Sequence, residues 1–95
     1  PRQNLSITGE VFFMRFFVYI LFSGKTEKFY TGQTQDITNR LEEHNSGETT
    51  SLKTGIPWKL VWSYECSSRS EAMKLESKIK KRGAKRFLGD LSRGA

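Results

Sequence analysis

An apolar run close to the N-terminus constrains the fold of this chain more than any other feature. The segment Phe16–Phe22 contains only aromatic, β-branched and aliphatic residues. A strand with one face in water alternates polar and apolar residues, so this segment is predicted to be a strand that is covered on both faces. The wider run Val11–Phe22 is interrupted by Arg15 and falls short of the roughly 20 apolar residues that span a membrane. It also lacks the features of a secretory signal, so no membrane partner is expected.

The next residues predict a β-hairpin followed by a helix. The polar segment Ser23–Lys28 holds a turn signal at Gly24, and Phe29–Gln33 is predicted to be the second strand. Asp36 suits the position that caps a helix N-terminus. The predicted helix has Ile37 and Leu41 on its buried stripe and Gly47 at its C-terminal end.

The second half of the chain predicts a third strand and two further helices. Glu48–Pro57 is rich in Thr, Ser and chain-breaking residues and is predicted to be a loop, and Trp58–Tyr64 is predicted to be the third strand. A helix capped by Ser68 or Ser70 follows, with Ala72, Leu75 and Ile79 at helical spacing. Gly83 ends it, and Ala84–Leu91 forms a last short helix. The predicted fold class is α+β: a small three-stranded antiparallel sheet flanked by helices.

The length of 95 residues suits one domain, and seven Phe, three Tyr and two Trp provide the side chains of a core. Cys66 is the only cysteine, which excludes an intrachain disulfide and favours a reducing, cytoplasmic environment. The chain begins with Pro, and Met14 is a plausible natural start. We therefore expect residues 1–13 to be an extension or a cloning remnant, and residues 14–95 to form the domain.

Positive charge is concentrated in the second half of the chain. The net charge is +6 overall, with −1 over residues 1–50 and +7 over residues 51–95. A one-sided positive field suits a polyanion such as nucleic acid, or an anionic membrane surface. A well-solvated basic domain without such a partner has the same composition.

Five short motifs together resemble the GIY-YIG nuclease family. Phe17-Val18-Tyr19 and Tyr30-Thr31-Gly32 resemble the two halves of the signature that names it. The motif Arg40-Leu41-x-x-His44-Asn45-Ser46-Gly47, the start of the third strand at Pro57–Val61, and Ser70–Glu76 on the following helix complete the pattern. The match covers about Phe16–Leu91 and resembles the small stand-alone members, similar to the nuclease domain of the excision-repair subunit UvrC. Phe17 and Thr31 replace Gly and Ile of the signature, and Leu88 stands near the place where many members have Asn.

The resemblance implies a metal-dependent endonuclease that hydrolyses phosphodiester bonds in DNA, and we expect it to select for DNA structure in repair or recombination. It implies catalytic roles for Tyr19, Tyr30, Arg40 and His44: Tyr19 takes a proton from water, Tyr30 orients water or phosphate, and Arg40 binds phosphate. It implies that Glu76 holds Mg²⁺ or Mn²⁺. One carboxylate is enough for an ion that keeps most of its water shell, and one His with one Cys cannot build a zinc site. No small-molecule cofactor beyond this divalent metal is expected.

Each of these residues also has an ordinary interpretation on pattern alone. Arg40 and His44, four apart, fit a solvated helix face that is distinct from the buried stripe of the same helix. Tyr19 and Tyr30 fit amphipathic strand positions, and neighbouring cations would have to lower the pKa of Tyr19 for it to act as a base. Glu76 fits an i,i+4 surface pair with Lys80.

Other residues are candidates for DNA contact or for a structural role. Gly32 either lets backbone come close at the end of the second strand or forms a bulge. The candidates for phosphate contact are Lys53 in the loop before Pro57 and a predicted basic ridge made of Lys74, Lys78, Lys80, Lys81, Arg82, Lys85 and Arg86. The rival function is a DNA-binding module that keeps the fold but cuts DNA weakly or not at all.

Overall fold

The computed structural model describes residues 15–94, so the proposed extension at residues 1–13 lies outside the described residues. The elements follow the predicted order, with one addition. They are β1 (Phe16–Ser23), β2 (Lys28–Thr34), α1 (Ile37–Asn45), a 3-10 helix η1 (Thr50–Gly55), β3 (Trp58–Cys66), α2 (Arg69–Arg82) and α3 (Ala84–Gly94).

The apolar strand β1 is the centre of a three-stranded sheet with the order β2-β1-β3. Both neighbours pair with it antiparallel, and Tyr19 lies opposite Gly32 on one side and Ser63 on the other. Val18, Tyr19, Ile20 and Leu21 are all buried. The predicted α+β fold is therefore confirmed, and the strand that was predicted to be covered on both faces is the central one.

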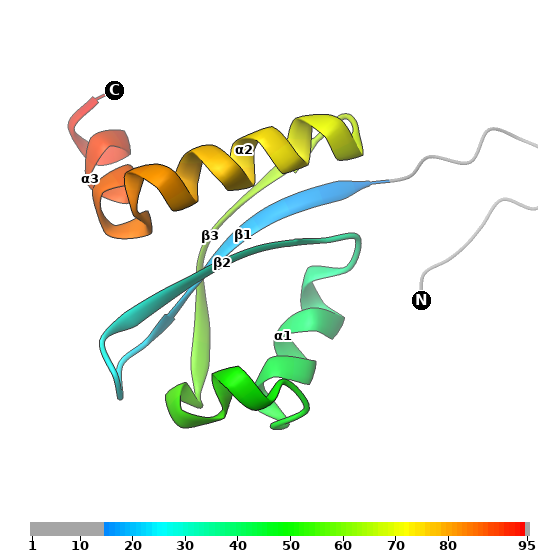
Figure 1. Ribbon diagram of the computed structural model, residues 1–95, viewed down its shortest axis with the longest axis vertical. Coiled ribbons are helices and arrows are strands. Elements are labelled where there is room, and N and C mark those ends of the chain that lie inside the picture. The colour runs from blue at the N-terminus through cyan, green and yellow to red at the C-terminus, as the bar shows by residue number, and fades with distance from the viewer. Residues whose placement is uncertain (1–14, 95) are drawn as a thin grey trace, which may run out of the picture.

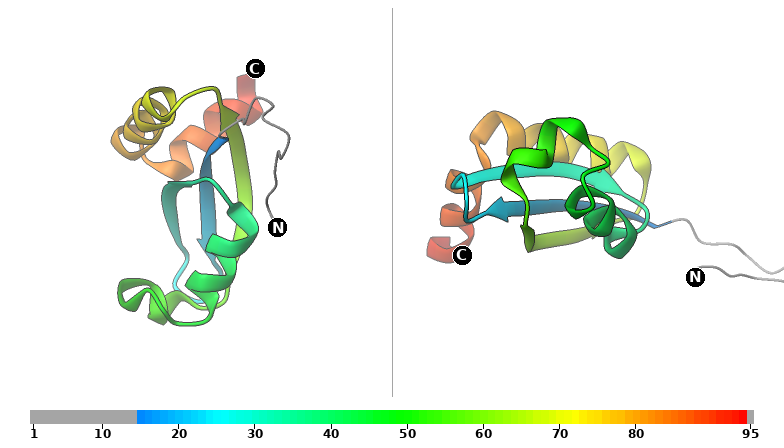
Figure 2. Two further views of the ribbon diagram at one scale, coloured as in Figure 1. Left: turned by 90° about the vertical axis from the view of Figure 1, so that its right-hand side faces the viewer. Right: turned by 90° about the horizontal axis from the view of Figure 1, so that it is seen from below.

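Alternate side chains of β1 belong to two separate cores, one on each face of the sheet. Val18 and Ile20 pack against α2 and α3, whereas Tyr19 and Leu21 pack against α1, η1 and the first residue of β3. Figure 1 shows α2 running along the sheet toward α3, while α1 and η1 lie at the other end of it; the two views in Figure 2 show the sheet between these groups of helices. The molecule has three layers, with β1 in the middle one.

Local sequence signals set most helix boundaries as predicted. The Asp36 side chain accepts a hydrogen bond from the Asn39 amide at 3.0 Å, and Ser68, rather than Ser70, caps α2 by accepting from the Glu71 amide at 3.1 Å. Gly83 ends α2 with a φ of +94°. The turn signalled by Gly24 lies at residues 24–27 between β1 and β2, and its left-handed residue is Glu27, with a φ of +59°.

The segment that the sequence predicted as a loop contains the 3-10 helix η1. It is held by the indole of Trp58, whose Nε1 donates to the Leu52 carbonyl at 2.9 Å. A Cβ at Gly55 would collide with the same indole, so the ring packs directly on the backbone of η1. These contacts come from a residue outside the segment, and the local sequence therefore did not indicate them.

Within residues 15–94, none of the helices is long enough and apolar enough to cross a lipid bilayer.

Asn45 joins the end of α1 to the start of β3. Its Oδ1 accepts from the Trp58 amide at 2.6 Å, and its Nδ2 donates to the Trp58 carbonyl at 3.0 Å. We predict that Asn45→Ala lowers the free energy of unfolding by about 1–3 kcal/mol, because it leaves two part-buried backbone groups without partners. Urea denaturation followed by tryptophan fluorescence measures the change.

Asn39→Ala is the matched control. Asn39 lies on the same helix, and its Nδ2 donates only to the exposed Glu43 carboxylate at 2.9 Å, so its loss should change stability by no more than about 0.5 kcal/mol. Equal effects of the two substitutions would contradict a role for Asn45 in holding β3.

Candidate functional site

The Tyr19 side chain leaves β1 toward α1 and passes over Gly32 of β2. Tyr19 is 2% exposed. A Cβ at position 32 would stand 2.7 Å from the Tyr19 hydroxyl oxygen and 2.9 Å from its Cζ, which is closer than real Cβ atoms come to other groups. Gly32 is therefore the residue that lets the phenol lie across the edge strand, and the group that comes close to this glycine is a side chain and not backbone.

His44 meets the Tyr19 hydroxyl from α1. Its Nε2 lies 3.1 Å from that oxygen, and its Nδ1 lies 3.0 Å from Oγ1 of Thr49. His44 is 3% exposed, which corrects the expectation that it shares a solvated face with Arg40. The reason is helical spacing: Ile37, Leu41 and His44 follow the i, i+4, i+7 pattern of one buried stripe.

Tyr30 completes a cluster of three rings. Its centroid lies 5.3 Å from that of His44 and 6.2 Å from that of Tyr19, and the indole of Trp58 lies 6.4 Å away on another side. Tyr30 is only half-buried, so it forms the outer wall of the cluster. Tyr19 and Tyr30 therefore project from adjacent strands to the same face of the sheet.

Burial keeps the inner members of this cluster uncharged. It raises the pKa of Tyr19 to about 12, helped by the neighbouring Tyr30 and opposed by the positive charge of Arg40. Burial, together with Arg40, lowers the pKa of His44 below its ordinary value of 6.5. At neutral pH the protein holds a neutral phenol against a neutral imidazole. The expectation that nearby cations lower the pKa of Tyr19 is wrong for the protein alone, because desolvation outweighs them.

Arg40 lies one helical turn before His44 on α1, and its guanidinium is half-exposed. Its Nε pairs with Oε1 of Glu43 at 3.2 Å. The charge of Arg40 acts on both Tyr19 and His44. The guanidinium is therefore close enough to influence both members of the Tyr19–His44 contact, and it is partly open to solvent.

Glu76 approaches the edge strand from the opposite face of the sheet, on α2. Its Oε1 accepts from Nε2 of Gln33 at 2.8 Å, and its Oε2 pairs with Nζ of Lys80 at 2.8 Å. Gln33 follows Gly32 directly on β2, and the charge of Glu76 acts on Tyr19. The five predicted residues thus gather at one edge of the sheet, four from the α1 face and Glu76 from the α2 face.

The donor set at Glu76 suits only one kind of metal ion. Across residues 15–94, no group of three or more His, Cys, Asp or Glu side chains could together hold a metal. A partly exposed carboxylate beside an amide fits an ion that keeps most of its own water, as Mg²⁺ and Mn²⁺ do. It does not fit a structural zinc site.

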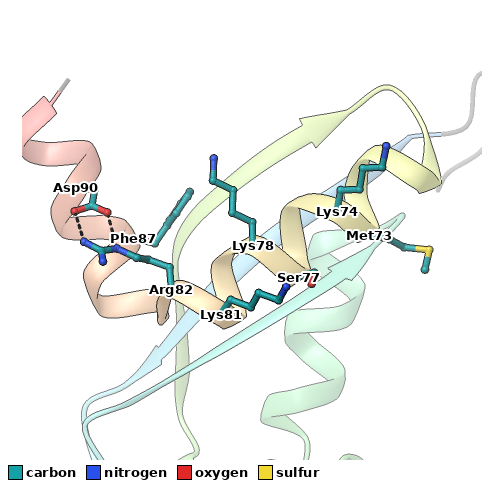
Figure 3. A pocket seen from close by; sticks show the side chains of 8 residues that line it. All are labelled: Met73, Lys74, Ser77, Lys78, Lys81, Arg82, Phe87 and Asp90. Carbon is teal, nitrogen blue, oxygen red and sulfur yellow. Dashed lines mark hydrogen bonds and ion pairs between the residues drawn. The ribbon is translucent and has the colours of Figure 1, made fainter.

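The predicted basic ridge does not form one surface. Lys74, Lys78, Lys81 and Arg82 line a hollow of about 790 Å³ between α2 and α3, together with Phe87 and Asp90. Figure 3 shows Lys74 and Lys78 extending to the same side of α2, and Arg82 bound to Asp90 through two contacts of 2.8 and 3.0 Å. Lys80 points away from this hollow and pairs with Glu76. Two further basic residues, Lys85 and Arg86, are exposed on α3, and Lys53 lies on η1, apart from all the others.

Sequence reasoning missed two residues that hold the site in place. Thr49 contacts Nδ1 of His44, and Gln33 contacts the Glu76 carboxylate. A polar residue directly after Gly32 on a strand was a usable signal for Gln33, whereas nothing in the sequence marks Thr49. Leu88, where many family members have Asn, packs against the core on the α2 face.

We predict that Gly32→Ala displaces the Tyr19 ring and lowers the free energy of unfolding by about 1–3 kcal/mol, the usual cost of overpacking. The added methyl group would also stand 3.1 Å from Cε2 of Tyr30. Because the Tyr19 hydroxyl must move away from His44, the ¹⁵N chemical shift of His44 Nε2 should change as well. Denaturation and NMR of labelled protein measure the two effects.

Gly24→Ala is the control on the same hairpin, because nothing lies within 4 Å of a Cβ at that position. It should leave the His44 shift unchanged and be neutral or slightly stabilising. A Gly32→Ala protein with parental stability and an unchanged His44 shift would show that Tyr19 does not depend on this glycine.

Comparison with known proteins points to the GIY-YIG family, which the sequence motifs also resemble. The family described as the GIY-YIG catalytic domain matches residues 15–87. The UPF0213 protein BH0048 of Halalkalibacterium halodurans is 37% identical over 68 residues, which cover 70% of this chain and 71% of that protein. A UPF0213 protein of Syntrophus aciditrophicus is 46% identical over 68 residues, covering 68% of this chain and 76% of that protein.

A solved structure agrees with these matches. The solution NMR structure of the UPF0213 protein BH0048 from Bacillus halodurans has a TM-score of 0.52 and 36% identity, and the match covers 82% of this chain and 85% of that one. The fold, the motifs and these relatives lead to one conclusion. The chain belongs to the GIY-YIG nuclease family, and the relatives to which it is similar are the UPF0213 proteins.

Proposed function

We propose that this chain is a metal-dependent endonuclease that hydrolyses phosphodiester bonds in DNA. The observation that carries the proposal is the 3.1 Å contact between the Tyr19 hydroxyl and Nε2 of His44. It joins a buried phenol, which reaches from the central strand across the edge strand β2, to a base. The cation Arg40 and the carboxylate Glu76 lie on opposite faces of the sheet beside this pair. Membership of the GIY-YIG family supports the nuclease class and DNA as the substrate.

Tyr19 and His44 act together to remove a proton from water. A phenol with a pKa of about 12 is neutral at neutral pH and cannot take a proton unless it gives up its own. Tyr19 accepts the proton of the attacking water while its own proton passes to Nε2 of His44. The imidazole is ready for this when its Nδ1–H donates to Thr49, which leaves Nε2 as the acceptor.

Arg40 binds the phosphate that is attacked. Its half-exposed guanidinium has five N–H donors, and the ion pair with Glu43 uses its Nε. The remaining donors can face two phosphate oxygens at once, the geometry for which arginine is suited. Tyr30, at the outer wall of the cluster, orients the water or the phosphate.

Glu76 holds the divalent ion, Mg²⁺ or Mn²⁺. When bound, such an ion offsets the negative charge that develops on the phosphate and lowers the pKa of nearby water. The partly exposed Glu76 carboxylate, its amide neighbour Gln33 and its place across β2 from Tyr19 support this assignment. Glu76 and Arg40 would then approach one phosphate from the two faces of the sheet.

The hollow between α2 and α3 binds the DNA backbone beside the cleavage site. Lys74, Lys78 and Lys81 line it with exposed ammonium groups, and Ser77 and Lys81 also line the smaller hollow that holds Glu76. The two hollows are therefore adjacent along one helix. A strand whose phosphate lies at Glu76 can place its neighbouring phosphates on these lysines.

One observation favours a second function, a DNA-binding module that cuts weakly or not at all. Both oxygens of Glu76 already have partners, Gln33 and Lys80. If the Lys80 ion pair is never broken, the carboxylate cannot hold a metal and only the binding surface is used.

We predict that Glu76→Gln lowers cleavage by about two to four orders of magnitude, the scale on which single catalytic groups act. The fold should persist, because Ala72 and Ile79 make the buried contacts of α2. DNA binding should persist too, or strengthen slightly as a negative charge is lost. A metal-dependent nicking assay on branched and linear duplexes measures cleavage, and a preference for branched DNA would support a role in repair or recombination.

Glu65→Gln is the control, because Glu65 also pairs with a basic residue, Arg15, at 3.6 Å, but on β3. It should cleave at the parental rate. A Glu76→Gln protein that is equally active would remove Glu76 as a metal ligand, and a parent that binds DNA without cutting it in Mg²⁺ or Mn²⁺ would favour the binding module.

We also predict that the affinity for duplex DNA falls by at least about tenfold between 50 and 200 mM salt. Replacing Lys74 and Lys78 together by Gln should weaken binding and reduce the slope of log K against log salt by about 1.8, or roughly 0.9 for each phosphate contact. Fluorescence anisotropy at a series of salt concentrations measures the slope.

The double substitution of Lys25 and Lys28 by Gln removes the same charge from the β1–β2 hairpin. It should reduce the slope by much less. If both double variants lose equal affinity, the hollow between α2 and α3 is not the contact surface and only the net charge matters.

A further inference from the structure

Lys80 is a basic residue of α2 that does not line the hollow between α2 and α3. It lies one turn after Glu76, and its Nζ is 2.8 Å from Oε2 of that residue. Among residues 15–94, Lys80 is the only basic residue that forms an ion pair with Glu76. The Glu76 side chain is 18% exposed and that of Lys80 is 57% exposed, so the ammonium covers the carboxylate from the solvent side.

The second oxygen of Glu76 is also occupied, but by a neutral group. Gln33 donates to Oε1 at 2.8 Å from the neighbouring strand. An incoming divalent cation meets a carboxylate with an amide on one oxygen and a positive charge on the other. The ammonium and the cation need the same negative charge and repel each other, so the Lys80 contact must break before a cation binds Oε2.

We propose that Lys80 occupies the cation position on Glu76 until a divalent ion displaces it, and thereby sets the affinity of the site for metal. The proposal rests on the metal site proposed above. Lys80 and Lys81 line a hollow of about 400 Å³ with Gln33, Glu76 and Ser77. The displaced ammonium stays in this hollow, where a phosphate oxygen of DNA is its natural new partner.

This arrangement couples the two ligands of the site. DNA that draws Lys80 away exposes the carboxylate for a metal ion, and a metal ion on Glu76 releases Lys80 for DNA. Each ligand therefore strengthens the binding of the other by the same factor. Without DNA the affinity for metal is low, which keeps the site from being loaded before a substrate arrives.

The test is the affinity of the DNA-free protein for Mn²⁺, measured by electron paramagnetic resonance with no need for cleavage. Lys80→Gln should bind Mn²⁺ roughly two- to fivefold more tightly than the parent, the upper part of the scale of a partly exposed ion pair. Lys80→Arg keeps the charge and the hydrogen bond, so its affinity should stay close to that of the parent. Circular dichroism verifies that each variant is folded.

Lys81→Gln is the matched control, because Lys81 is the next residue and lines the same hollow. It removes the same charge without touching the Lys80–Glu76 pair, and its effect should be less than twofold. Equal increases in Mn²⁺ affinity for Lys80→Gln and Lys81→Gln would overturn the proposal, because the affinity would then depend only on the net positive charge near the site. An unchanged affinity in Lys80→Gln would overturn it as well.

Two further outcomes separate this proposal from the proposed function. If the parent binds Mn²⁺, Glu76→Gln abolishes binding and Lys80→Gln has no effect, the metal site stands and the role of Lys80 is overturned. If neither the parent nor Lys80→Gln binds Mn²⁺ even with Glu76 intact, the metal site itself fails and the role of Lys80 fails with it.

Discussion

A phenol buried in the middle of a small sheet must find a partner for its hydroxyl group, because an unsatisfied buried donor costs about 1–3 kcal/mol. In this chain the partner of Tyr19 is His44, and that requirement organises the α1 face of the molecule. The position of the Tyr19 ring requires a glycine at position 32. The contact also requires the end of α1 to lie close to the sheet, which buries the imidazole of His44. Thr49 then satisfies the other nitrogen of that imidazole and fixes the path of the chain into η1.

The same burial determines the electrostatics of the site. Taken out of water, Tyr19 and His44 both shift toward their neutral forms, while the charged groups Arg40 and Glu76 remain near the surface on opposite faces of the sheet. The charged groups are therefore accessible from solvent, whereas the neutral rings of Tyr19 and His44 are shielded from it. This separation follows from the edge strand β2, because its consecutive residues face opposite sides: Gly32 lies against Tyr19, and Gln33 contacts Glu76.

Much of the fold could be predicted from the sequence because its signals are local. The uninterrupted apolar run predicted the central strand, and Asp36 and Ser68 mark their helices by the hydrogen bonds that their own side chains make. The 3-10 helix could not be predicted, because the Trp58 indole that holds it comes from another element. The burial of His44 was missed although its spacing from Ile37 and Leu41 contained the signal. Helical spacing also predicts that Lys80 points to another side of α2 than Lys74, Lys78 and Lys81, which are four and three residues apart.

The division of β1 between two cores has a consequence for how the sequence can change. Neighbouring residues of this strand face opposite layers, so the loss or gain of a single residue within it would exchange the two sets of side chains. Tyr19 would then point at the apolar surfaces of α2 and α3, and an aliphatic neighbour would replace it beside His44. A substitution in β1 changes only one of the two faces. An insertion or deletion of one residue would move the side chains of the candidate site to the α2 face and the core side chains of that face to the candidate site.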